Sequence, residues 1–171
     1  MNKQSQDNQR EAILLSYLAG IIDGEGTIRI GATKPPAKHP NWNITYYASI
    51  GLGMTDKTVI ELFAKKFGAK LRKECVPNRK IVYRWGTCGN KAVPKIVKRL
   101  LPYLIVKKKQ AELVIKFCEN RRITGFRRNK KLPINELRRR QELYLKIKKL
   151  NAVGAPATTK QEDTREGEAM V

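Results

Sequence analysis

The sequence has few of the residues that most metal and redox sites need. It contains one histidine, His39, and three cysteines, Cys75, Cys88 and Cys118, which stand far apart and form no Cys-x-x-Cys pair. These counts argue against a zinc finger, a binuclear histidine site, a Cys–His hydrolase and a multi-histidine nuclease. A small, unclustered cysteine set also fits a reducing compartment, with the cysteines acting as packing residues.

Long apolar segments and nucleotide-binding motifs are missing as well. No run of 18 apolar residues occurs, residues 1–10 are polar, and there is no Walker A pattern. We therefore expect a soluble, intracellular protein without a signal peptide, a membrane partner or ATP-driven chemistry.

Acidic residues are scarce relative to basic ones. The 171 residues include 15 Asp plus Glu and 36 Lys plus Arg, giving a formal net charge of +21. Residues 151–171 hold four acidic and two basic residues, so residues 1–150 carry 34 basic and 11 acidic residues, or +23. With 41% hydrophobic residues the chain can bury a core. We expect a flexible segment 1–10, one folded domain 11–150 and a disordered tail 151–171, with a polyanion as the partner.

Hydrophobic periodicity predicts an α+β fold. Residues 11–23 are apolar on all sides and predict a buried helix that Gly24 and Gly26 end. Residues 27–33 and 45–54 alternate as strands do. The remaining predictions are a helix over 56–67 with Thr55 as its N-cap, a hairpin of 70–76 and 80–87, and helices over 91–101, 106–119 and 133–150. Four antiparallel strands with helices on one side leave the other sheet face open.

One short stretch is unusual in such a basic chain. Residues 18–26 read LAGIIDGEG, with Gly20 and Gly24 on one helix face, where they allow close approach of another helix. From glycine spacing alone, a contact within the chain is the simpler interpretation. Asp23 and Glu25 place two carboxylates at a helix C-terminus, which disfavours anions. They are either solvated or include a ligand for a hard cation.

This stretch resembles the LAGLIDADG motif of homing endonucleases and intron maturases, with six of nine positions identical. Residues 54–57 resemble that family's junction between its second strand and second helix, and residues 101–111 resemble the segment that carries its catalytic lysine. The chain has one copy of the motif and no internal repeat. The resemblance implies an α-β-β-α-β-β-α core and the single-motif type, which acts as a homodimer.

The resemblance also implies roles for individual residues. Glu25 would bind a divalent metal, Mg²⁺ or Mn²⁺, and Gly24 would lend its backbone carbonyl, whereas Asp23 would be structural. Lys107 would lie near the phosphate, although composition alone favours a solvated helix start there. Asp56 stands where relatives commonly carry a water-orienting Gln. Ile60 stands where several relatives carry Arg or Lys, so that basic residue is missing or is supplied elsewhere, for example by Lys57.

The open sheet face is the predicted DNA-binding surface, because a β-ribbon fits the major groove. Strand parity nominates Arg29, Thr33, Tyr47 and Ser49. The basic hairpin, in which parity is ambiguous because both faces carry charge, nominates Lys73, Arg79, Lys80 and Arg84. Arg29 and Arg84 are the residues we expect to read guanine edges, while most single basic residues only contact phosphates or solvent. The implied dimer interface comprises Leu18, Gly20, Ile21 and Gly24.

The leading expectation is a site-specific homing endonuclease. It would make double-strand breaks in a long pseudo-palindromic DNA target by metal-dependent phosphodiester hydrolysis, and so promote intron mobility. The alternative is an intron maturase on the same fold, which binds intron RNA with or without nuclease activity. A basic structural RNA-binding protein is the third reading, and composition alone would favour it.

Overall fold

The structure is a computed structural model of the chain and describes residues 3–38, 42–69, 71–75, 77–119 and 132–152. Its elements in chain order are α1 (Lys3–Glu25), β1 (Gly26–Thr33), β2 (Thr45–Met54), α2 (Lys57–Phe67), β3 (Arg72–Glu74), β4 (Val82–Cys88), α3 (Ala92–Leu100), the 3₁₀ helix η1 (Leu101–Tyr103), α4 (Lys108–Glu119) and α5 (Ile134–Ala152).

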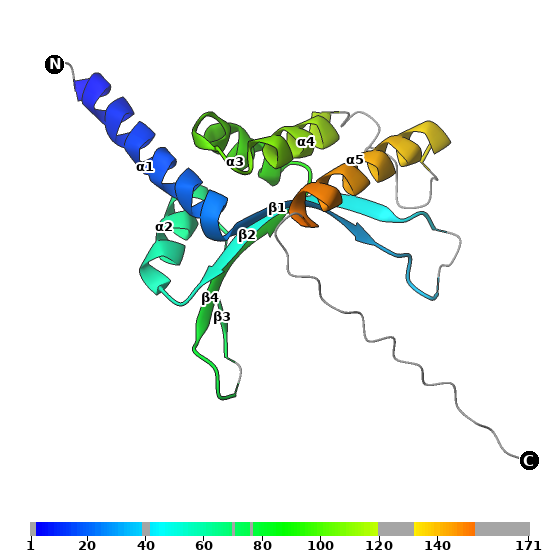
Figure 1. The fold of residues 1–171 in the computed structure, drawn as a ribbon, viewed down its shortest axis with the longest axis horizontal. Coiled ribbons are helices and arrows are strands. Elements are labelled where there is room, and N and C mark those ends of the chain that lie inside the picture. The colour runs from blue at the N-terminus through cyan, green and yellow to red at the C-terminus, as the bar shows by residue number, and fades with distance from the viewer. Residues whose placement is uncertain (1–2, 39–41, 70, 76, 120–131, 153–171) are drawn as a thin grey trace, which may run out of the picture.

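The strands form one antiparallel sheet in the order β1-β2-β4-β3. Helices α3, α4 and α5 lie along one side of this sheet, and the strands curve away from them (Figure 1). The predicted α+β fold, with a four-stranded antiparallel sheet open on one face, is confirmed.

The core lies between the sheet and the helices. Ile28 of β1 and Ile50 of β2 are buried, while the residues beside them in each strand are exposed or half-buried. This alternation is what a sheet with one covered face requires. Trp85 of β4 completes the layer: its ring lies 4.9 Å from that of Phe63, and its Nε1 donates to the carbonyl of Gly68 at 2.7 Å.

The first helix is longer than expected at both ends. Residues 3–10 are helical and continue α1, because Lys, Gln and Arg are good helix formers and no glycine or proline interrupts them. Glu11 ties this part to the fold through Lys66 of α2 at 3.1 Å and Arg99 of α3 at 2.7 Å. The helix also passes through Gly24 and ends at Glu25, since one helical glycine costs only about 1 kcal/mol.

Other boundaries differ slightly from the predictions. The N-cap of α2 is Asp56, whose Oδ1 accepts the N–H of Thr58 at 2.8 Å, and not Thr55. Strand β3 covers residues 72–74 where we predicted 70–76, and β4 covers residues 82–88 where we predicted 80–87. Cys75 and Cys88 are exposed, so only Cys118 is the packing residue that we expected of all three.

Helix α5 covers the edge strand β1 and is anchored at both ends. Near its start, the buried carboxylate of Glu136 pairs with Arg139 at 2.9 Å and Arg140 at 2.7 Å, and Arg139 also donates to carbonyls at the end of α4. At its end, Asn151 donates to the carbonyl of Ile28 at 3.1 Å. The helix thus includes Asn151 and Ala152, which we had assigned to the tail; residues 153–171 lie outside the described residues.

We predict that Glu136→Gln costs about 2 kcal/mol of unfolding free energy at pH 7, because it leaves Arg140 buried without its carboxylate. The hydrogen bond from Arg139 is the main cause that holds the pKa of Glu136 below its ordinary 4.5. Its contribution is therefore complete above about pH 4.5 and is lost as the pH falls through the lower, folded value. Urea unfolding is the measurement: the difference in unfolding free energy between Glu136→Gln and wild type should be smaller in the acid range than at pH 7.

Glu61→Gln is the matched control, since Glu61 forms an exposed i,i+4 pair with Lys57 at 2.7 Å. It should cost less than about 0.5 kcal/mol. Equal losses in the two variants would show that the buried network does not hold α5.

Candidate functional site

Asp23 clamps the end of α1 to the start of α4. Its carboxylate accepts three backbone N–H groups that precede α4, from Ile105 at 2.7 Å, Val106 at 3.2 Å and Lys107 at 2.8 Å. In return, the ammonium of Lys107 donates to the backbone carbonyl of Asp23. Each helix end receives the charge that its dipole favours. Asp23 is therefore structural, as expected, and Lys107 lies against the motif.

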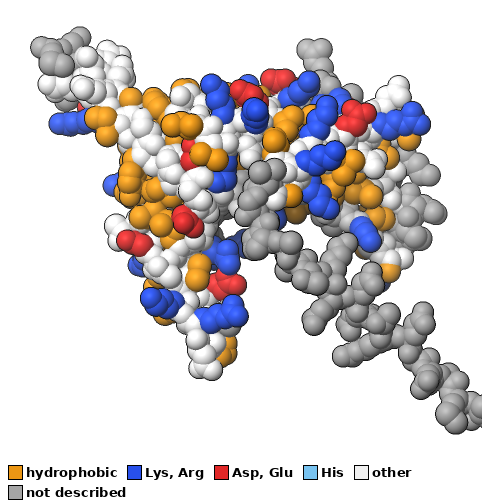
Figure 2. Space-filling view, in the orientation of Figure 1, with side chains coloured by type: hydrophobic (Ala, Val, Ile, Leu, Met, Phe, Trp, Pro, Cys, Tyr) orange, Lys and Arg blue, Asp and Glu red, His pale blue; other side chains and the backbone are white. Residues whose placement is uncertain are grey.

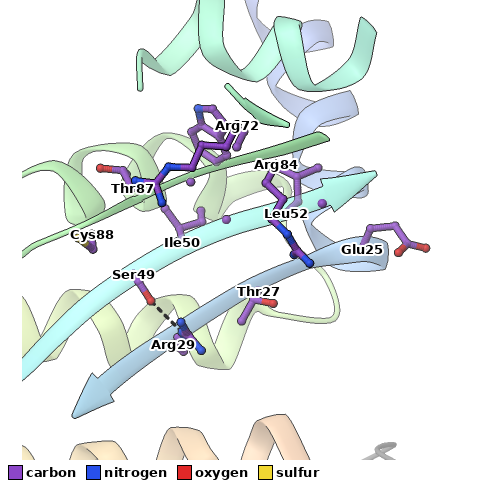
Figure 3. A pocket seen from close by; sticks show the side chains of 14 residues that line it. Glu25, Thr27, Arg29, Ser49, Ile50, Leu52, Arg72, Arg84, Thr87 and Cys88 are labelled. Atoms are coloured by element: carbon purple, nitrogen blue, oxygen red, sulfur yellow. Dashed lines mark hydrogen bonds between the residues drawn. The ribbon is translucent and has the colours of Figure 1, made fainter. Parts of the chain in front are cut away.

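Glu25 is the last residue of α1 and lies at the rim of a groove on the open sheet face. The groove has a volume of about 540 Å³, and its lining includes Glu25, Thr27, Arg29, Arg72, Arg84 and Cys88. Glu25 extends beyond the start of β1, away from the strands (Figure 3). No side chain among the described residues makes a hydrogen bond or ion pair with its exposed carboxylate. A free carboxylate thus stands at one end of a basic groove.

The β1–β2 half of the open face has the predicted side chains. Arg29 pairs with Ser49 in the register, and its Nε donates to the Ser49 hydroxyl at 3.1 Å (Figure 3). Tyr47 pairs with Gly31, and its ring fills the space where a Cβ on Gly31 would lie. Thr33 is exposed at the end of β1. The predicted strand parity is correct for this pair.

In the β3–β4 half, the strand register places Lys73 and Arg84 on opposite faces of the sheet. Arg84 pairs with Gly53 of β2 on one side and with Arg72 of β3 on the other, and all three belong to the open face. Lys73 instead pairs with Tyr83 and takes the face of Trp85. The sequence left the parity of this hairpin open; the register places Lys73 on the face opposite Arg84, and Arg72, which we did not nominate, lines the groove.

Three further predicted residues, Arg79, Lys80 and Asp56, do not line the groove. Arg79 and Lys80 are exposed in the hairpin connection, and Figure 2 shows Lys and Arg side chains gathered around this hairpin. Asp56 follows β2, whose Leu52 pairs with Gly26, so Asp56 and Glu25 belong to the same end of the sheet. One oxygen of Asp56 is engaged in capping α2. Asp56 is absent from the groove lining.

The glycine face of α1 is open. A Cβ added at Gly20 or Gly24 would meet no atom of the described residues within 4 Å, so these glycines serve no contact within that part of the chain, contrary to the simpler interpretation. Ile13 and Tyr17 continue the same helix face and are 64% and 50% exposed. Leu18, predicted at the interface, is fully buried, because it points with Leu15 and Ile22 into the core. Ile21 is half-buried.

Two more apolar side chains lie near this face. Ile105 and Val106 are 86% and 69% exposed in the segment whose N–H groups Asp23 holds. Ile60 stands at the position where the family resemblance implies a basic residue in several relatives. In this chain it is fully buried in α2 and cannot reach the groove.

The oxygen atoms at the C-terminal end of α1 are suited to bind a cation that a substrate phosphate also contacts. Among the described residues, no group of three or more His, Cys, Asp or Glu side chains could hold a metal ion. Mg²⁺ commonly takes one or two carboxylates, substrate phosphates and waters. The Glu25 carboxylate and the last carbonyls of α1, including that of Gly24, are hard oxygen donors at a helix end that favours cations. This set fits Mg²⁺ or Mn²⁺ beside a phosphate and does not form a closed protein cage.

Comparison with known proteins agrees with this architecture, although no protein-family model matches the chain. The chain is 31% identical over 105 residues to DNA endonuclease I-CreI of Chlamydomonas reinhardtii. That alignment covers 61% of this chain and 62% of I-CreI, which is less than two thirds of its length.

Solved structures show the same fold. Homing endonuclease I-CvuI, in complex with the I-CreI target, superposes with a TM-score of 0.68 at 19% identity over 88% of both chains. The archaeal intron-encoded homing endonuclease I-Vdi141I, complexed with DNA, gives 0.65 at 18% identity, over 90% of this chain and 91% of its own. The LAGLIDADG homing endonuclease I-GzeII gives 0.56 at 16% identity, over 78% of this chain and 43% of its own.

The chain has the LAGLIDADG homing-endonuclease fold. Its sequence holds one LAGLIDADG-like stretch, and the structural match covers 88% of I-CvuI but less than half of I-GzeII. None of the helices in the described ranges is long and apolar enough to cross a membrane.

We predict that Asp23→Asn destabilises the fold by about 2 kcal/mol, because an amide has one acceptor oxygen and would turn its NH₂ toward a backbone donor. Asp56→Asn is the matched control. Asn and Asp cap helix N-termini equally well, so this change should cost little. Chemical denaturation of both variants is the measurement, and equal costs would contradict the clamp.

Proposed function

We propose that this chain is a homodimeric, divalent-metal-dependent and site-specific DNA endonuclease that promotes intron mobility. The observation that carries the proposal is the groove on the open sheet face, which contains three arginines and ends at the unpaired carboxylate of Glu25. The relative I-CreI is a DNA endonuclease, and I-CvuI binds a DNA target. The mobility part rests on the motif resemblance and on the intron-encoded origin of I-Vdi141I.

The open face suits double-stranded DNA. Curved antiparallel strands fit a major groove, where Arg29 and Arg84 can donate to guanine N7 and O6. Arg72, Arg79 and Lys80 add positive charge along the hairpin for phosphate contacts. The net charge of +21 makes binding fast and strongly salt-dependent, but the side chains on the strands supply the choice of sequence.

The exposed glycine face of α1 supports a second copy of the chain as the partner. Gly20 and Gly24 let two α1 helices approach closely, and Ile13 and Tyr17 would be covered in the same contact. An isologous dimer places two grooves end to end and brings the two Glu25 residues to the centre. Such a dimer matches a pseudo-palindromic target with half-sites of about one helical turn.

Each chain would supply the same groups to one scissile phosphate. A Mg²⁺ or Mn²⁺ ion bound there would polarise the phosphate and activate a water. Glu25 and the Gly24 carbonyl would hold that ion, and the Lys107 ammonium, which lies against Asp23 of the motif, would offset negative charge on the phosphate. The carboxylate oxygen of Asp56 that does not cap α2 is available to orient water.

We predict that Glu25→Gln abolishes cleavage and leaves DNA binding intact within about twofold. The amide cannot supply the anionic ligand, but it removes no contact that holds the fold. Duplexes selected for binding from a randomised library would be incubated with Mg²⁺, with Mn²⁺ and with EDTA. Wild type should cut both strands only with metal; Glu142→Gln, an exposed acid on α5, is the charge-matched control.

A fully active Glu25→Gln would contradict the site. Wild type that binds intron RNA and supports splicing, but cuts no selected duplex, would favour the maturase instead.

We further predict that Gly20→Leu converts the dimer into a monomer of 19.5 kDa without unfolding it. A Cβ added at Gly20 meets no described atom within 4 Å, and leucine is a better helix former than glycine, so we expect the change to block the contact between copies and to leave the fold intact. Light scattering after size exclusion gives the mass, and circular dichroism reports the fold. Gln141→Leu adds the same side chain to exposed α5 and should leave the dimer unchanged. A dimeric Gly20→Leu would contradict the helix interface.

A further inference from the structure

The guanidinium of Arg84 is held in place on the open face by two neighbours. Its Nε donates to Glu74 of β3, and the side chains of both residues are about half exposed, 56% and 46%. On the other side of β4, a Cβ built on Gly53 would lie 3.0 Å from Arg84 Nη1 and 3.3 Å from its Cγ. The arginine therefore lies across the bare backbone of Gly53 while Glu74 holds its Nε.

This arrangement leaves particular donors free. A guanidinium has five N–H donors, of which the one on Nε is engaged with Glu74. Those on Nη1 and Nη2 remain on the groove side, since Arg84 lines the groove. Two adjacent donors are what the N7 and O6 acceptors of guanine require.

Stability does not explain the pair. Exposed ion pairs contribute little to folding, and β3 has only three residues in the structure. A carboxylate on a DNA-facing surface also opposes phosphate binding. What it supplies is a fixed orientation for a side chain that otherwise has many rotamers, which lowers the entropic cost of a specific contact.

We propose that Glu74 is a positioning residue that fixes Arg84 for bidentate recognition of one guanine in each half-site, and that Gly53 leaves the space in which the Arg84 side chain lies. The inference rests on the proposed function, because it takes double-stranded DNA as the ligand. Ser49 accepts a hydrogen bond from the Nε of Arg29 in the same manner, so two of the three arginines that line the groove are oriented by a neighbouring strand.

The test is a binding selection with the full-length chain. Duplexes with a randomised segment of about two helical turns are selected in EDTA, so that none is cut, and sequenced. Wild type should enrich guanine at a symmetric pair of positions, and Arg84→Ala should lose the enrichment there and nowhere else. Glu74→Ala should weaken it at the same positions by at least about fivefold, the lower range for one bidentate contact.

Two variants separate positioning from simple charge. Glu74→Gln retains an oxygen that accepts the Nε–H, so it should keep most of the guanine preference, whereas Glu142→Gln removes one negative charge elsewhere and should change no position. Gly53→Ala pushes against Nη1 and should weaken the same positions as Glu74→Ala. Thermal unfolding of each variant confirms that it is folded.

Different failures have different meanings. If Glu74→Ala and Glu74→Gln both tighten binding to all duplexes and leave the sequence profile unchanged, Glu74 is only a nearby charge and the inference is overturned. If Arg84→Ala keeps the guanine preference, the inference falls while the proposed endonuclease stands. If wild type enriches no sequence, both are overturned.

Discussion

The hydrogen bonds from residues 105–107 to the Asp23 carboxylate determine where the functional groups lie. They join two segments more than 80 residues apart in sequence and fix the end of α1 against the start of α4. Because α1 ends there, Glu25 stands at the rim of the sheet and Gly26 can begin β1 immediately. The same contact brings Lys107 to the motif. The contact between Asp23 and residues 105–107 thus positions the Glu25 carboxylate, the Lys107 ammonium and the start of β1 together.

Glycines on the open face make room for larger neighbours. The Tyr47 ring covers Gly31, and Arg84 crosses Gly53, so each glycine allows a long side chain to lie flat on the sheet. Gly51 and Gly86 are a register pair, and a Cβ on either would press on the other strand's backbone. The groove is therefore shaped as much by missing side chains as by those present. That shape lets rigid strands, rather than loops, present the arginines.

The strands of the open face and the position of Glu25 were predictable from local sequence patterns. The period-two alternation of residues 27–33 and 45–54 gave the correct open face, and the motif located Glu25. Register and long-range pairing were not accessible: whether Arg72 or Lys73 shares a face with Arg84 depends on which residue of β4 each one opposes. Leu18 was misplaced because the helix seemed apolar on all sides, although Leu15 and Ile22 share its buried face while Ile13 and Tyr17 do not. Nothing local to Glu74 signals that it holds an arginine.

The neighbouring acids of the motif illustrate how the fold divides stability from function. Asp23 faces the N-terminus of α4, where the helix dipole and three N–H groups favour its charge. Glu25, two residues later, stands at the C-terminus of α1, where the dipole opposes a negative charge and no described side chain offsets it. In a chain with a net charge of +21, a lysine at this point would serve folding better. In the proposed complex a divalent cation would offset the charge of this carboxylate, so the free protein would hold the site at a cost to its own stability.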